Sequence, residues 1–280
     1  MKNMKNVLSI AGSDCSAGAG IQADLKTFVA NGVYGMTVIT SLTAQNPQKV
    51  KMLEDVSIEM LEKQTEAIFD VMEVSAVKIG MLNSKENGEV IYEKLLKYKA
   101  KNIVLDPVMI ATSGNSLIKD ETKDFLVNRL FKIVDIITPN LDETKEIVKI
   151  ILNNENIENI DSIEKMKNYG KVIADFTKKW VLIKGGHLSN SAVDILMNKD
   201  EIYILEGEKI SSNNTHGTGC SLSSAIASNL AKSYSMLDSV KKAKNFVLSS
   251  IKNSVDFGEI AGTVNQMGEI YKNIDIEKLY

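Results

Sequence analysis

The stretch NTHGTGCSLSSAIA, residues 214–227, predicts a loop that passes directly into a helix. Gly217 and Gly219 allow a tight turn with uncovered backbone N–H groups, and the small residues from Ser221 onward favour close helix packing. The first N–H groups of a helix lack intrahelical partners, and the helix dipole adds about half a positive charge there. The stretch therefore predicts an anion-binding loop; the structural alternative is an ordinary N-capped helix behind a glycine turn.

Cys220 lies at the start of this predicted helix, where the dipole favours the thiolate over the thiol. The thiolate of Cys220, lying beside a bound anion, is a candidate base. The alternative is a small buried residue that only packs. Motifs elsewhere in the chain are needed to choose between the two.

Composition indicates a globular protein with a small ligand. The 280 residues are 44% hydrophobic and 25% charged, which fits one domain over residues 1–280. The net charge of −3 gives no reason to expect nucleic acid or a membrane as a partner. Cys15 and Cys220 lack metal-ligand spacing, and no apolar run is long enough for a signal peptide or a membrane span. We therefore expect a cytoplasmic protein with free thiols.

Short apolar runs alternate with amphipathic segments of helical length, which predicts an α/β fold with a mostly parallel, helix-covered sheet. The expected strands are 7–11, 36–42, 75–79, 103–105, 134–138 and 181–183, and the expected helices are 22–31, 57–71, 84–98, 120–131, 142–151 and 162–178. Segments 192–197 and 201–205 predict an antiparallel hairpin. Residues 153–159 predict a surface loop.

All three prolines, Pro47, Pro107 and Pro139, follow the carboxyl end of an expected strand. Ligands of open α/β sheets bind beyond these ends, so the polar residues beside the prolines are candidates for a site. Simple termination of a strand is the alternative for each proline.

Residues 18–23 match the dinucleotide-binding pattern G-x-G-x-x-A, which raises the alternative of a dehydrogenase. The glycines, however, begin well after the expected strand ends at Ala11. No acidic residue between Asp24 and Glu54 is available for a ribose hydroxyl. We instead expect this loop to lie over a substrate, with Asp24 as a hydrogen-bond acceptor. The structural alternative is a loop that only leads into a helix, where the negative charge of Asp24 interacts favourably with the helix dipole.

Charged residues at three strand ends suit phosphate and metal. Asp106 can bind a metal ion that carries phosphate. Lys184, which is followed by glycine, can reach phosphate as a point charge. Asn140 and Glu143 lie three residues apart where a strand gives way to a helix, so they share one face or form a capping box. The chain has no P-loop motif, so any nucleotide must bind without one.

Two other strand ends suit an aromatic ring. Gln45 offers a donor beside an acceptor, which fits the edge of a polar heterocycle, although a buried glutamine can equally bond to backbone. Met81 can cover an aromatic face or be plain core.

Eight motifs in order between about residues 7 and 230 resemble the hydroxymethylpyrimidine and phosphomethylpyrimidine kinases of thiamine biosynthesis, in the ribokinase superfamily. They are AGSD (11–14), GAGIQADLKT (18–27), TAQN (43–46), KIGM (78–81), DPVM (106–109), TPNL (138–141), KGGH (184–187) and THGTGC (215–220). Two segments depart from the family pattern, CSA at 15–17 and GTVNQ at 262–266.

The resemblance implies a three-layer α/β/α fold, a homodimer, ATP with Mg²⁺, and phosphorylation of 4-amino-5-hydroxymethyl-2-methylpyrimidine followed by phosphorylation of its monophosphate. It implies that Gln45 contacts the pyrimidine and that Cys220 is the catalytic base. Pyridoxal kinase is the main alternative, and a dehydrogenase or a non-catalytic binding module is more remote. The full set of expected site residues is Gly217, Thr218, Gly219 and Cys220 for catalysis, Gln45, Asp24, Met81 and Val108 for substrate, Asn140, Lys184, Thr215, Gly217 and Gly219 for nucleotide, and Asp106 and Glu143 for metal.

Overall fold

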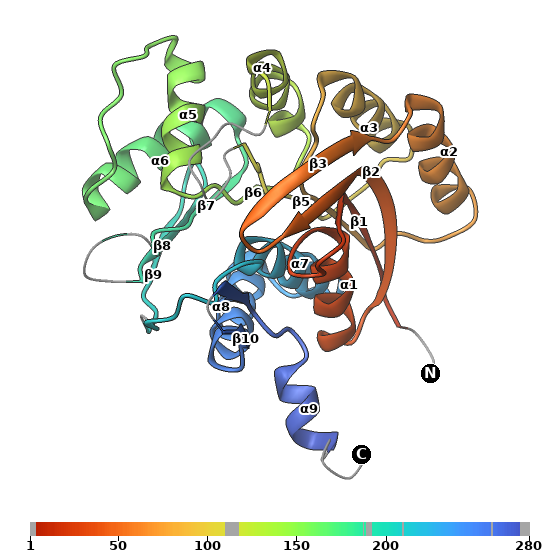
Figure 1. The fold of residues 1–280 in the computed structure, drawn as a ribbon. Coiled ribbons are helices and arrows are strands. Elements are labelled where there is room, and N and C mark those ends of the chain that lie inside the picture. Colours follow the sequence, from red (N-terminus) through yellow and green to blue (C-terminus); the bar gives the residue numbers. More distant parts are fainter. Residues whose placement is uncertain are drawn as a thin grey trace. The chain divides into compact units, whose positions relative to one another are not determined.

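The structure is a computed structural model that describes residues 4–109, 118–186, 188, 192–208, 210–258 and 260–274. The chain divides into two compact units. Figure 1 shows its helices and strands coloured along the sequence. Unit 1 comprises Met1–Lys78 and Ile210–Tyr280, and unit 2 comprises Ile79–Lys209. The single domain expected over residues 1–280 stays a prediction.

Unit 1 has four neighbouring strands in the order β3-β2-β1-β4. Their bounds are β1 (Asn6–Asp14), β2 (Tyr34–Asn46), β3 (Lys49–Asp55) and β4 (Ala76–Ile79). Consecutive residues of β1, Val7 and Leu8 among them, are fully buried because helices cover both faces of this strand. The pairing of β1 with β2 continues to Asp14, so β1 is longer than the sequence predicted.

Helices α1 and α2 cover opposite faces of the unit 1 strands. The chain steps from β1 to β2 through α1, and then back past β1 to β4 through α2, so right-handed crossovers place the two helices on opposite sides. Helix α7 packs against α1 and α8 (Figure 1). The helices of unit 1 are α1 (Gly20–Ala30), α2 (Ile58–Phe69), α7 (Thr218–Ala231), α8 (Met236–Lys252) and α9 (Gly268–Ile274).

Unit 2 has the strand order β5-β6-β7-β8-β9. Strands β5 (Ile103–Leu105), β6 (Ile136–Ile137) and β7 (Trp180–Ile183) are parallel. Strands β8 (Asp194–Met197) and β9 (Ile202–Leu205) continue antiparallel, which confirms the predicted hairpin. The helices of unit 2 are α3 (Lys85–Lys97), α4 (Asp120–Asn128), α5 (Leu141–Leu152) and α6 (Ile163–Thr177), with a 3-10 turn at Leu130–Lys132.

These units confirm the predicted α/β fold class and every helix expected from the sequence. The sequence prediction missed helices α8 and α9, strand β3, and the hairpin of β10 (Val255–Phe257) with β11 (Ile260–Thr263). Both β3 and β10 are almost entirely exposed, so no buried face imposes a hydrophobic alternation on them. Pro47 therefore lies in the two-residue turn of the β2–β3 hairpin and does not begin a connection to a helix. No helix within the described parts of the chain is long and apolar enough to cross a membrane.

Candidate active site

The predicted passage from a glycine loop into a helix is present, but α7 begins at Thr218, earlier than expected, so Gly219 and Cys220 lie in its first turn. Gly217 is the N-cap with φ of 88°, a left-handed conformation that favours glycine. A side chain on Gly217 would also collide with the carbonyl oxygen of Gly18. The N–H of Thr218 donates to Thr215 O at 3.2 Å, so this amide is already engaged within the loop. A bond from Thr218 N–H to a phosphoryl oxygen would have to replace that contact or share it.

Cys220 lies in the first turn of α7 and its side chain is half-buried. Its carbonyl oxygen accepts a hydrogen bond from Ser223 Oγ at 3.1 Å, within the same helix. The sequence therefore placed the thiol correctly at the helix N-terminus. Its action as a base stays a prediction.

The C-terminal segment that departs from the family pattern packs along this loop within unit 1. The N–H of Val264 donates to His216 O at 3.2 Å, and Gln266 Nε2 donates to Ser221 Oγ at 3.0 Å. Gln266 is buried, and its side chain contacts the first turn of α7 through this hydrogen bond.

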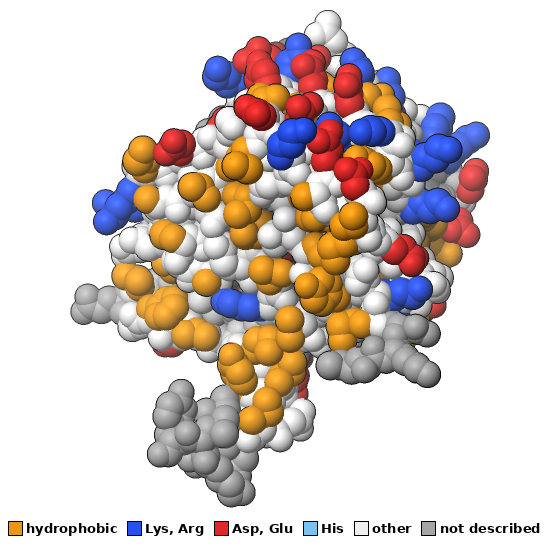
Figure 2. Space-filling model, turned by 90° about the vertical axis from the view of Figure 1, so that its right-hand side faces the viewer, with side chains coloured by type: hydrophobic (Ala, Val, Ile, Leu, Met, Phe, Trp, Pro, Cys, Tyr) orange, Lys and Arg blue, Asp and Glu red, His pale blue; other side chains and the backbone are white. Residues whose placement is uncertain are grey.

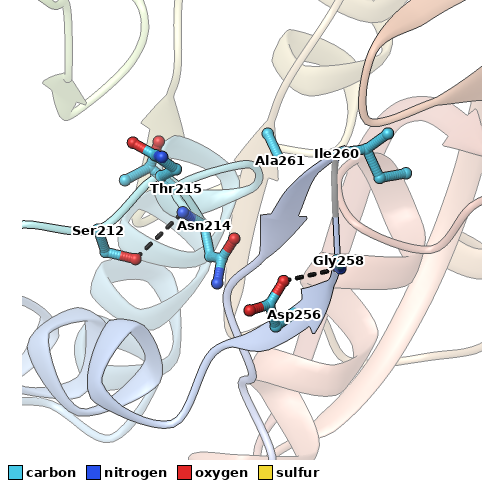
Figure 3. A pocket seen from close by; sticks show the side chains of 8 residues that line it. Ser212, Asn214, Thr215, Asp256, Gly258, Ile260 and Ala261 are labelled. Carbon is cyan, nitrogen blue, oxygen red and sulfur yellow. Dashed lines mark hydrogen bonds between the residues drawn. The ribbon is translucent and has the colours of Figure 1, made fainter.

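A cavity of about 590 Å³ lies beside the loop, between the segment that leads into α7 and the β10–β11 hairpin (Figure 3). Asn214 Oδ1 accepts a hydrogen bond from Gly262 N at 2.7 Å, which ties the two segments together. The lining residues are Ser212, Asn213, Asn214, Thr215, Asp256, Gly258, Ile260 and Ala261. The volume is in the range of small-molecule sites. Of these residues the sequence analysis had named Thr215 as a site residue and Asn214 as the start of the glycine-loop stretch. Asp256, Gly258, Ile260 and Ala261 come from the β10–β11 region, where the sequence showed no binding motif.

Gln45 is held at the end of β2 by its neighbours. Thr43 Oγ1 lies 3.1 Å from Gln45 Oε1 and 2.9 Å from Ser13 O. Cys15 Sγ lies 3.2 Å from Gln45 O and 3.4 Å from Gln45 N. Residues two apart on a strand share a face, so the alternation of β2 could have indicated Thr43 as the partner of Gln45.

Asp24 is fully buried and both of its carboxylate oxygens have partners. Oδ2 accepts from Ser9 Oγ at 2.5 Å and from Lys78 Nζ at 2.8 Å, and Oδ1 accepts from Ser224 Oγ at 2.7 Å. These bonds connect α1 to β1, β4 and α7. Because Asp24 is 0% exposed, a contact with substrate would require the surrounding side chains to move. The role of Asp24 in binding substrate stays a prediction.

Three charged residues meet in unit 2, where the carboxyl ends of β5 and β7 lie near the start of α5. Lys184 Nζ is 2.9 Å from Asp106 Oδ1 and 4.0 Å from Glu143 Oε2. Thr138 Oγ1 donates to the same oxygen of Asp106 at 3.1 Å. Asp106 and Glu143 are buried, and Lys184 is half-buried. The structure thus brings three of the predicted site residues together, because parallel strands end at one edge of a sheet. Their binding of metal and phosphate stays a prediction.

The predicted capping box of α5 is confirmed. Asn140 Oδ1 accepts from Glu143 N at 2.8 Å, and Glu143 Oε2 accepts from Asn140 N at 2.8 Å. Burial raises the pKa of Glu143 to about 7, even though nearby Lys184 favours the ionised form; the charge of Asp106 adds to the increase. Glu143 is therefore a buried acid that titrates near neutral pH, in addition to its role as a cap.

The four residues predicted to bind substrate divide between the units. Gln45 and Asp24 belong to unit 1, and Met81 and Val108 belong to unit 2. Met81 and Val108 are both half-buried, directly after β4 and β5 respectively. That the four form one pocket stays a prediction.

Comparison with known proteins agrees with these features. The sequence profile of the family described as phosphomethylpyrimidine kinase matches residues 14–265. The hydroxymethylpyrimidine/phosphomethylpyrimidine kinase of Aquifex aeolicus (strain VF5) is 43% identical over 253 residues, which cover 90% of this chain and 96% of that protein.

Two solved structures are similar over most of their length. Phosphomethylpyrimidine kinase from Clostridium difficile 630 has a TM-score of 0.77 and 43% identity, covering 88% of this chain and 99% of that one. The ADP complex of Bacillus subtilis pyridoxal kinase has a TM-score of 0.87 and 32% identity, covering 96% of this chain and 99% of that one. These matches confirm the resemblance found in the sequence motifs, and the chain belongs to the phosphomethylpyrimidine kinase family.

Proposed function

We propose that this protein is an ATP-dependent kinase that phosphorylates 4-amino-5-hydroxymethyl-2-methylpyrimidine and then its monophosphate, giving the diphosphate used in thiamine biosynthesis. The observation that carries the proposal is the N-terminus of α7, where the glycine cap at Gly217 is followed by the backbone amides of the first turn and by the Cys220 side chain. Phosphoryl transfer needs positioned charge stabilisation beside a group that accepts a proton. Membership in the kinase family supports the same reaction.

ATP is the proposed phosphoryl donor. A similar kinase structure contains ADP, and the 590 Å³ cavity adjoins Thr215 at the start of the glycine loop. We assign the adenine or ribose of ATP to this cavity, and its phosphates to Thr215, Gly217 and Gly219 in unit 1. Asn140 and Lys184 of unit 2 are proposed to contact the donor phosphates, Lys184 as a point charge.

Mg²⁺ is proposed to accompany ATP, with Asp106 and Glu143 acting around it. Mg²⁺ keeps several waters and binds through one or two carboxylates together with substrate phosphates. Lys184 Nζ lies 2.9 Å from Asp106 Oδ1 and 4.0 Å from Glu143 Oε2. A bound cation would favour the ionised form of Glu143 over the protonated form that burial favours.

Cys220 is proposed as the base of the first phosphorylation. Its thiolate takes the proton of the hydroxymethyl group as the alcohol oxygen attacks the γ-phosphorus of ATP. The bond from that phosphorus to the bridging oxygen breaks, and ADP leaves with the electron pair. The amides of Gly217, Gly219 and Cys220 are assigned to the transferring phosphoryl group; Thr218 N–H joins them if its bond to Thr215 is given up.

The aminopyrimidine is the proposed substrate, with Gln45 as the selecting residue. The 4-amino group and a neighbouring ring nitrogen offer a donor beside an acceptor, which a carboxamide complements. Pyridoxal is the alternative substrate, because several structural relatives are pyridoxal kinases. The test is to compare kcat/KM for the two alcohols on one preparation. A higher value for pyridoxal would reverse the assignment, and diphosphate formed from the monophosphate would establish the second step.

A homodimer in the cytoplasm completes the proposal. Edge strand β3 and its neighbour β2 expose Leu42, Val50 and Met52, with exposed fractions of 52%, 47% and 62%. Exposed hydrophobic side chains also spread across the middle of the face in Figure 2, whereas acidic and basic side chains mix toward its top. Sedimentation equilibrium tests the assembly: Met52→Lys should weaken a dimer that uses the β2–β3 surface, and a wild-type monomer would contradict it.

A further inference from the structure

His216, the residue immediately before Gly217, contacts a buried carboxylate. Its Nε2 lies 3.3 Å from Oδ2 of Asp14, the last residue of β1. Asp14 is only 2% exposed. Its other contacts hold the segment that leads into α1, because Ser16 N donates to Oδ1 and Ala19 N donates to Oδ2, each at 2.8 Å. Asp14 therefore connects the entrance of α1 to the entrance of α7 within unit 1.

The charge of Asp14 makes it a permanent acceptor. Burial alone would raise its pKa, but hydrogen bonds from His216, from the Ser16 hydroxyl and from the backbone N–H groups of Ser16 and Ala19 outweigh burial and hold the pKa well below its usual range. Lys26, which donates to Ala17 O at 2.7 Å, adds a cation nearby. Because an ionised carboxylate can only accept, His216 must present an Nε2–H, either as the neutral tautomer or as the imidazolium.

The remaining contacts of His216 leave its ring little freedom. A Cβ atom on Gly18 would collide with the imidazole Cδ2 of His216, so this position of the ring requires glycine at residue 18. On the other side, the backbone of His216 pairs with Thr263, and its carbonyl oxygen accepts from Val264 N. His216 thus joins the loop before α1, the loop before α7 and the end of β11.

The cap residue of α7, Gly217, makes no side-chain hydrogen bond, as is also true of the caps of α1 and α4, whereas α2, α3, α5, α6 and α8 each have a serine or asparagine cap. The contact of His216 with Asp14 therefore supplies a side-chain restraint that the cap of α7 does not. We infer that His216 is a positioning residue for phosphoryl transfer: by donating to Asp14 it holds residues 217–220 in the conformation that binds the transferring phosphoryl group. This inference rests on the proposed kinase function, and it gives His216 no contact with substrate.

Three substitutions at position 216 separate positioning from general stability. His216→Gln keeps an Nε2–H at about the same reach and should retain most of kcat. His216→Leu keeps apolar volume without a donor, and His216→Asn keeps an amide that is too short. Because small misplacements of a catalytic group can cost about 10²-fold, we expect kcat to fall roughly 10²-fold in His216→Leu and His216→Asn while KM for the alcohol changes little.

Melting temperature and kcat are measured on all three variants beside wild type. Equal kcat in His216→Leu and wild type would overturn the inference, as would equal losses in His216→Gln and His216→Asn. If His216→Leu fails to fold, the comparison of kcat between His216→Gln and His216→Asn is sufficient to test the inference. A wild-type protein that forms no ADP with either alcohol would instead refute the proposed function, so the two failures are distinguishable.

Discussion

Lys184 Nζ lies 2.9 Å from Asp106 Oδ1, an ion pair that joins the carboxyl ends of β7 and β5 in unit 2. Glu143 Oε2 is 4.0 Å from the same ammonium. One cation therefore faces two buried carboxylates. Burial raises the pKa of Glu143, Lys184 favours its ionised form, and the charge of Asp106 adds to the increase. A Mg²⁺ ion bound beside Glu143 is therefore expected to favour the ionised carboxylate.

The first prediction concerns the metal. Glu143→Gln removes one oxygen charge from the proposed Mg²⁺ site but keeps a similar shape, so half-maximal activity should need more Mg²⁺ while KM for the pyrimidine changes little. Titration of initial rate against free Mg²⁺ at saturating ATP measures this. An unchanged Mg²⁺ requirement would leave Glu143 with its capping role alone.

The second prediction concerns pH in the absence of Mg²⁺ and ATP. The folded pKa of Glu143 is about 7 and its ordinary value is 4.5, so the folded state holds the proton more tightly than the unfolded state. The contribution of Glu143 to stability is therefore full below about pH 4.5 and is lost as pH rises to about 7, by up to about 3 kcal/mol. Denaturant unfolding at pH 5 and pH 8 should show this decline in wild type relative to Glu143→Gln. Parallel pH profiles of the two proteins would contradict it.

The third prediction concerns Cys220. General-base assistance contributes about 10²- to 10⁴-fold, so Cys220→Ser should reduce turnover of the alcohol by that order and leave the affinity for ATP nearly unchanged. The second phosphorylation should suffer less, because a phosphate oxygen with its second pKa near 6 is already largely ionised at neutral pH. Single-turnover rates for the alcohol and the monophosphate test both points. Unchanged alcohol turnover would make Cys220 a packing residue.

The fourth prediction concerns specificity. Gln45→Ala should narrow the gap in kcat/KM between the aminopyrimidine and pyridoxal, because each unpaired buried polar group costs roughly 1–3 kcal/mol in the selective site. Thr43→Val provides a companion test, since Thr43 Oγ1 lies 3.1 Å from Gln45 Oε1 and helps to orient the carboxamide. A preserved preference in Gln45→Ala would show that other residues select the ring.

The fifth prediction concerns the buried pair of Lys78 with Asp24. Both side chains are 0% exposed, so Lys78→Met leaves a buried carboxylate without its cation and should reduce the free energy of unfolding by roughly 3–5 kcal/mol. Lys63→Met is the matched control: the Lys63 side chain in its pair with Glu66 is 67% exposed, and its loss should cost less than about 1 kcal/mol. Equal changes in the two variants would contradict a structural role for Asp24.

The parallel core and the strand-end cluster follow from the sequence alone. Buried runs such as those of β1 and β7 carry continuous hydrophobic residues, and helices with apolar spacing of three and four lie between them. Parallel strands end at a common edge, so Asp106 and Lys184 could be expected near one another from topology. Asn140 and Glu143 could be paired from their spacing, because capping boxes are local.

Only the tertiary structure decided the partners of residues far apart in the chain. Asp24 precedes Ser224 by 200 residues and Asp14 precedes His216 by 202, and no local pattern relates either pair. Exposed strands such as β3 and β10 likewise form because a neighbouring strand supplies hydrogen bonds, which their own side chains do not signal. The periodicity of a sequence indicates which face of an element is buried. The partner of a buried side chain such as Asp24 depends instead on how distant elements pack, which local sequence does not specify.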